Sequence, residues 1–135
     1  MTQAESTMSN RSPLALAVSF TIALFAVGIP YWQIPYAQVG LPNSICNLGL
    51  LITLVAPIWL RGIVRISFLK AVMVVGLAAP TAVILRIIVE TSRDPTSHNL
   101  WPLEVILTGG VSLAVALAGA VLGCGLRVLL SRSAT

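Results

Sequence analysis

The chain has 135 residues, of which 57% are apolar and 9% are charged, and its formal net charge is +4. An ordinary soluble domain carries about 25% charged residues, and a domain of this length cannot hide so much apolar surface from water. The composition therefore excludes a typical water-soluble domain and predicts a small integral membrane protein with one domain.

The N-terminal part of the chain is predicted to hold a polar tail and one membrane helix. Residues 1–12 are polar and are expected to form a disordered cytoplasmic tail. An apolar run over residues 13–30 is predicted to be a helix, with Pro13 in its first turn and Pro30 at its end. This helix is expected to be retained, because no small-residue cleavage site of a signal peptide follows it.

An aromatic loop and a second span are predicted next. The sequence YWQIPYAQVGLP at 31–42 holds two prolines and no charge, so it is expected to lie as a loop at the membrane interface. A second transmembrane helix is predicted over residues 43–60, and Pro57 is expected to kink it near its end. The basic connector at 61–70 follows and is expected to lie at the membrane surface.

Two further spans complete the predicted fold. The third covers residues 71–89, with Pro80 near its middle, and the fourth covers residues 103–126 after a polar turn. Residues 127–135 are expected to form a second cytoplasmic tail. The predicted fold class is all-α, a polytopic bundle of four transmembrane helices.

The distribution of basic residues predicts the orientation of this bundle. Six of the eight basic residues fall in the two tails and in the connector between the second and third spans: Arg11, Arg61, Arg65, Lys70, Arg127 and Arg132. By the positive-inside rule these segments are cytoplasmic, so both termini are predicted to be inside. Four aromatic residues then fall at the outer interface, as Tyr and Trp prefer: Tyr31, Trp32, Tyr36 and Trp101.

Three charged residues near the outer interface form a candidate polar site. Arg86 and Glu90 lie one helical turn apart on the third span, and Glu104 lies at the head of the fourth. The favoured interpretation is that Arg86 extends to the headgroups as an anchor and pairs with Glu90 in an exposed position. The alternative is a polar site that faces the bundle and is completed by Glu104.

Potential metal ligands and cysteines give no predicted site. Glu90, Asp94 and His98 recur every four residues, but Pro95 interrupts the helix that would align them, so neither a metal nor another cofactor is expected. The two cysteines fall near opposite faces of the membrane, too far apart for a disulfide.

Small residues follow one face of the fourth span. They are Gly109, Ser112, Ala116, Gly119 and Gly123, spaced alternately by three and four positions. Small side chains allow close approach of helix backbones in lipid. The favoured interpretation is packing within one chain, and the alternative is an interface with a second copy or another protein.

The sequence predicts no enzyme, because no nucleophile with a base and no phosphate-binding loop is visible. Nucleic acid is not an expected partner, since the basic residues do not gather on one face. The leading hypothesis is an accessory or structural subunit in a bacterial inner membrane, packed on itself or on a larger membrane protein. The alternative is a small-solute transporter or channel. Arg86 turned into the bundle beside a cavity favours the alternative. Arg86 turned toward the headgroups, with the Gly109–Gly123 face of the fourth span left open, favours the subunit.

Overall fold

The computed structural model describes residues 3–40, 48–95 and 100–133, and in these ranges the chain is helical with no strand. Three helical stretches are long and apolar enough to cross a membrane: Ser12–Trp32, Phe68–Thr91 and Trp101–Arg132. The chain is therefore all-α, and its three long apolar helices fit a membrane-embedded protein.

Helix α1 (Gln3–Trp32) is longer than predicted at both ends. The expected disordered tail at 1–12 differs from the structure, in which the backbone is helical from Gln3. Extending an existing helix gains one hydrogen bond for each residue added, so a polar segment can continue it. The helix also passes through Pro30 and ends two residues later, since a proline removes one backbone donor without preventing the following turn.

Helix α2 (Leu48–Gly62) is the described part of the predicted second span, and residues 43–47 lie outside the described residues. The helix is apolar but has only 15 residues, fewer than the approximately 20 that cross a bilayer. Pro57 lies inside α2 and is buried. Between α1 and α2, the short 3-10 helix η1 (Tyr36–Gln38) falls within the predicted aromatic loop.

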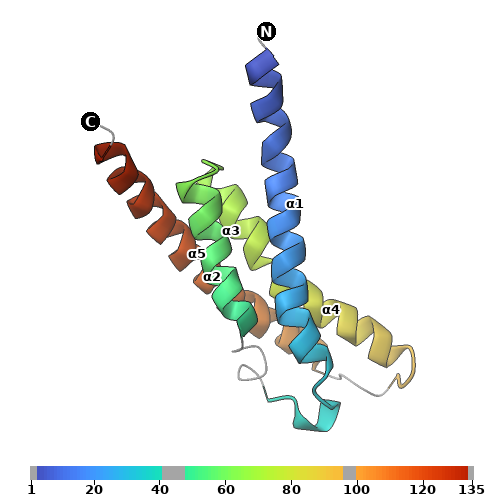
Figure 1. Ribbon diagram of the computed structural model, residues 1–135. Coiled ribbons are helices and arrows are strands. Elements are labelled where there is room, and N and C mark those ends of the chain that lie inside the picture. Colours follow the sequence, from blue (N-terminus) through green and yellow to red (C-terminus); the bar gives the residue numbers. More distant parts are fainter. Residues whose placement is uncertain (1–2, 41–47, 96–99, 134–135) are drawn as a thin grey trace.

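The predicted third span consists of two helices, α3 (Phe68–Gly76) and α4 (Ala78–Thr91), with a break at Leu77. Pro80 explains the position of the break. It has no N–H to donate to the carbonyl four residues earlier, which belongs to Gly76, and its ring crowds that carbonyl. Pro80 itself lies in the first turn of α4, where a missing donor is tolerated. The two helices point in different directions (Figure 1).

Helix α5 (Trp101–Arg132) contains the predicted fourth span and continues beyond it. Residues 127–132, expected to belong to a tail, form its last turns. Their sequence RVLLSR remains favourable for a helix, because leucine and arginine have high helix propensity.

The helices alternate in direction, and α2 packs against α1, α3 and α5. Helix α1 runs one way, α2 returns, α3 and α4 together run back, and α5 returns again, so the described chain ends lie at the same end of the bundle (Figure 1). We call this the basic end, since it carries Arg61, Arg65, Lys70, Arg127 and Arg132. The opposite, acidic end carries Glu90, Asp94 and Glu104.

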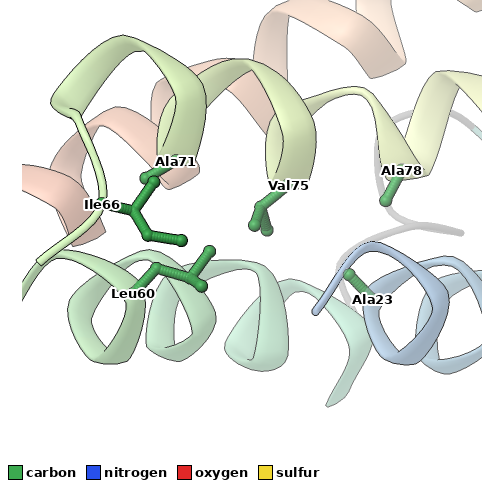
Figure 2. Packing of buried hydrophobic residues seen from close by; sticks show 6 residues of the cluster. All are labelled: Ala23, Leu60, Ile66, Ala71, Val75 and Ala78. Atoms are coloured by element: carbon green, nitrogen blue, oxygen red, sulfur yellow. The ribbon is translucent and has the colours of Figure 1, made fainter. Parts of the chain in front are cut away.

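The core is built largely from small and medium side chains. One cluster joins α1, α2, α3, α4 and the α2–α3 connection through Ala23, Leu60, Ile66, Ala71, Val75 and Ala78 (Figure 2). Many large apolar side chains remain exposed on the outside, among them Leu51, Ile63, Ile106 and Leu129. Their exposure over the long helices is the pattern expected where lipid is the solvent.

Candidate functional site

Arg86 lies at the acidic end of the bundle and turns inward. It is 5% exposed, and its guanidinium reaches the chain just where α1 ends. Nη1 donates to the Tyr31 carbonyl at 2.8 Å, Nη2 donates to the Ile34 carbonyl at 2.6 Å, and Nε donates to Glu90 Oε1 at 2.8 Å. The favoured expectation of an anchor directed to the headgroups is therefore not met.

The end of α1 explains why this arginine is buried. The last carbonyls of a helix have no partner inside the helix, and in an apolar surrounding each unpaired carbonyl is costly. Arg86 supplies donors to two carbonyls of this region from a different helix. Its positive charge also interacts favourably with the negative end of the helix dipole. Arg86 thus acts as a cap that ties α4 to α1.

Tyr31 and Trp32 join the same contact, although sequence reasoning expected them at the interface. Tyr31 is fully buried, and the Arg86 Cζ atom lies 4.7 Å from the centre of its ring. Trp32 is half-buried, and its indole N–H donates to the Ala82 carbonyl at 3.0 Å. Aromatic residues suit both interfaces and cores, so composition alone does not distinguish the two.

The two acidic residues of the predicted site lie around Tyr31. Glu90 forms the ion pair with Arg86, and its side chain is 30% exposed. Glu104 is half-buried at the start of α5. Val105, the residue next to Glu104, packs against the cluster formed by Tyr31, Val83 and Ile87. The structure therefore gathers the three predicted residues around a tyrosine that sequence reasoning placed elsewhere.

A cavity of about 390 Å³ adjoins this polar cluster. It is lined by Trp32, Leu85, Arg86, Val89, Glu90 and Arg93. Its walls combine apolar side chains with charges of both signs, so the arrangement suits an amphipathic or ionic group more than a purely apolar one.

Potential metal ligands do not cluster in the described part of the chain. No group of three His, Cys, Asp or Glu residues there could hold a metal ion. His98 and Cys46 lie outside the described residues. Cys124 is a free, half-buried thiol on α5 and accepts a hydrogen bond from Arg61 Nε at 3.2 Å.

The predicted small-residue face of α5 is not left open, because α2, α3 and α4 pack against it. Ser112, Ala116, Gly119 and Gly123 are buried, while Gly109 is half-buried. A Cβ atom at Gly119 would collide with the Leu54 carbonyl oxygen, and one at Gly123 would lie 2.9 Å from the Ile58 carbonyl oxygen. Helices α2 and α5 thus approach at the level of their backbones.

A second small-residue face on α5 escaped the sequence reasoning. Gly110, Ala114, Ala118 and Gly125 are exposed, on roughly the opposite side of the helix from the buried face. A Cβ atom at Gly110 or Gly125 would meet no other atom within 4 Å. The spacing of four positions between Gly110, Ala114 and Ala118 could have indicated this face from the sequence. The longer series of small residues on the other face was interpreted instead.

Comparison with protein-family models, with curated proteins and with solved structures finds no match.

Proposed function

We propose that the protein is a small structural or accessory subunit of a membrane, which packs through α5 against a second copy or a larger membrane protein. The observation that carries this proposal is the open face formed by Gly110, Ala114, Ala118 and Gly125. The opposite face of the same helix is occupied by α2, so the open face has no packing role within the described chain.

The physical basis of the proposal is the behaviour of small residues in lipid. Lipid tails are as apolar as leucine, so helices gain nothing from hydrophobicity when they associate there. They gain dispersion contacts when small side chains let two backbones approach closely. A glycine in a helix interior also costs about 1 kcal/mol relative to alanine. If Gly110 and Gly125 only met lipid, they would carry this cost without the compensating contacts.

The use of Arg86 supports a structural role. Buried charges in membrane proteins are candidates for transport pathways. Here three N–H groups of Arg86 already bind atoms of the same chain, two of them backbone carbonyls. This buried charge therefore holds α4 against the end of α1.

We further propose four crossings with both termini in the cytoplasm, in a bacterial inner membrane. In this topology the second crossing is the span expected at 43–60, and α2 is the part of it that the structure describes. The basic residues of the α2–α3 connection and of the α5 end lie at one end of the bundle, which supports a cytoplasmic position for that end.

A transporter or channel for a small solute is the second candidate. Two observations favour it: Arg86 faces the bundle beside a cavity of about 390 Å³, and the span that carries it is broken at Leu77. Broken helices commonly form the binding sites of transporters. In this reading Arg93 and Glu90 at the cavity would select the charge of the solute.

Cysteine crosslinking tests the subunit proposal. The parent chain carries Cys46→Ser and Cys124→Ser. A single cysteine is then introduced as Ala114→Cys on the open face, or as the control Ile22→Cys, an exposed position on α1. In native membranes, oxidation is expected to link Ala114→Cys to a second copy or to a larger protein, and to leave Ile22→Cys largely unlinked.

A companion variant, Ala114→Leu, should disperse the oligomer or release the partner while the melting temperature of the chain stays unchanged. The subunit proposal is contradicted if the two cysteine positions crosslink equally and both variants purify as single chains. Solute flux in proteoliposomes that Glu90→Gln abolishes without lowering the melting temperature would instead support a transporter.

A further inference from the structure

We propose that the basic end of the bundle carries a binding site for the phosphate headgroup of an anionic phospholipid. A partly open cavity of about 390 Å³ lies there between the last turn of α2 and the last turns of α5. It is lined by Arg61, Cys124, Arg127, Val128 and Ser131. Its volume falls in the range of about 300–1,000 Å³ that is usual for small-molecule sites.

Arg61 is held in position by the chain with donors to spare. Its Nε donates to Cys124 Sγ at 3.2 Å, and its Nη1 donates to the Ile66 carbonyl at 3.0 Å. A guanidinium has five N–H groups in a rigid fork that matches phosphate oxygens. These two contacts fix the orientation of the guanidinium and leave its other N–H groups available.

Arg127 and Ser131 supply further groups from α5. Arg127 is exposed and has no hydrogen-bonding or ionic partner within the described part of the chain. The Ser131 hydroxyl donates to the Val128 carbonyl at 2.8 Å, and rotation of that hydroxyl would let it donate to a phosphate oxygen instead. Two cations from two helices therefore converge on one cavity.

The electrostatic surroundings favour an anion. No acidic side chain lines the cavity, and Glu90, Asp94 and Glu104 lie at the other end of the bundle. Arg65 and Lys70 are exposed near the start of α3 and add positive charge to the same end. Basic pockets between membrane helices on the cytoplasmic side are suited to anionic lipid headgroups.

The neighbouring apolar surface favours a lipid over free phosphate. Val128 lines the cavity, and the adjacent Leu129 and Leu130 are exposed. A lipid that placed its phosphate between the arginines could lay its acyl chains along these side chains. The inference is independent of the proposed subunit role, because it uses neither the open face of α5 nor any protein partner.

Cys124 provides a reporter for occupancy, because its thiol lines the cavity. The Cys46→Ser chain is placed in nanodiscs of phosphatidylcholine alone or with added phosphatidylglycerol, and the rate of Cys124 modification by an uncharged maleimide is measured. Phosphatidylglycerol is expected to slow the reaction. Arg127→Gln should weaken this protection by about fivefold, as expected for one cation at a membrane surface. Arg93→Gln, at the acidic end, should leave it unchanged.

The variants separate a site from general surface charge. A negative membrane surface slows the thiol reaction in every variant alike, so equal protection in the parent and in Arg127→Gln overturns the proposal. Melting temperatures of both variants are compared with the parent to exclude misfolding. In a second arm, inorganic phosphate is added to phosphatidylcholine nanodiscs. Protection by inorganic phosphate that matches phosphatidylglycerol would assign the cavity to a soluble anion and overturn the lipid as ligand.

Discussion

At the scale of single residues, Arg86 is the side chain that contributes most to the stability of the acidic end. An exposed i,i+4 ion pair would contribute only about 0.3–0.5 kcal/mol. The structure shows instead a buried guanidinium that also binds the carbonyls of Tyr31 and Ile34. Its removal would take the guanidinium donors away from both carbonyls and leave the Tyr31 carbonyl only the Ile34 N–H at 3.3 Å, which costs more than the loss of a surface pair.

We therefore predict that Arg86→Ala lowers the free energy of unfolding by about 3–5 kcal/mol, the range for loss of one partner from a buried polar cluster. Glu90→Ala, whose side chain is 30% exposed, is expected to cost less. Thermal unfolding in a mild detergent measures both. An Arg86→Ala protein as stable as the parent would show that the guanidinium is not the cap of α1.

Tyr31 gives a second prediction at this scale. Its side chain is fully buried, yet its hydroxyl has no hydrogen-bonding partner within the described residues. Tyr31→Phe keeps the ring under Arg86 and removes only that hydroxyl, so stability should change by less than about 1 kcal/mol. Tyr31→Ala should be far more damaging, since it removes the whole ring from the core, at a cost of about 3–5 kcal/mol. A large loss in Tyr31→Phe, measured in the same unfolding assay, would reveal a partner for the hydroxyl.

Sequence spacing predicted part of this site and could not predict the rest. The four-residue interval between Arg86 and Glu90 was sufficient to predict their contact, because a helix brings such positions together. The direction of Arg86 depended on α1, whose contacting carbonyls are more than 50 positions away in the chain. No local pattern encodes a contact of that separation, and the same limit explains why Tyr31 was expected at the interface.

At the scale of helices, the close approach of α2 and α5 is the decisive contact. Gly119 lies against the backbone of Leu54, so even one methyl group has no room unless the helices separate. By contrast, a Cβ at Gly109 would lie 3.8 Å from Pro80, which is an ordinary contact. Two glycines of the same predicted series are therefore expected to respond differently to the same substitution.

We predict that Gly119→Ala destabilises the protein by about 1–3 kcal/mol, as overpacking does, and that Gly119→Leu is worse. Gly109→Ala serves as the matched control and should be neutral or stabilising, since alanine is the better helix former. Leu117→Phe, on the exposed side, should change stability by less than about 0.5 kcal/mol. If Gly109→Ala proved as damaging as Gly119→Ala in thermal unfolding, the backbone contact with α2 would not be the cause.

The sequence was most informative about helices and least about their ends. Apolar length predicted the three long spans, because a bilayer requires that length. Pro80 predicted an irregular third span. The break falls at Leu77 because Pro80 cannot donate a hydrogen bond to the carbonyl four residues earlier, which is next to Leu77. Both terminal segments were expected as tails, and α1 and α5 continue into them, because helix extension depends on neighbouring turns rather than on polarity.

At the scale of the whole molecule, α2 is held on two sides through glycines. Gly49 approaches Val27 of α1 so closely that a Cβ there would lie 2.6 Å from the Val27 Cα atom, and Gly119 and Gly123 bring α5 onto the other side. These contacts, the Arg86 cap and the core of Figure 2 join the helices without large apolar side chains at every interface. The larger side chains are left for the outer surface, where lipid can meet them.

The proposed topology gives the whole-molecule prediction, because it sets the side of the membrane on which the basic end of the bundle lies. Reporter pairs that are active only in the cytoplasm or only outside it are fused after Arg65, after Asp94 and at the C-terminus. The distribution of basic residues predicts cytoplasmic signals after Arg65 and at the C-terminus, and an external signal after Asp94.

The fusion after Arg65 is the one measurement that tests the account most directly, because it depends on α2 crossing the membrane even though its described part has only 15 residues. With α1 entering from the cytoplasm, a crossing by α2 returns the chain to the cytoplasm at Arg65. We predict a cytoplasmic signal there, together with the external signal after Asp94. An external signal after Arg65 would mean that α2 does not cross, and would contradict the four-span account.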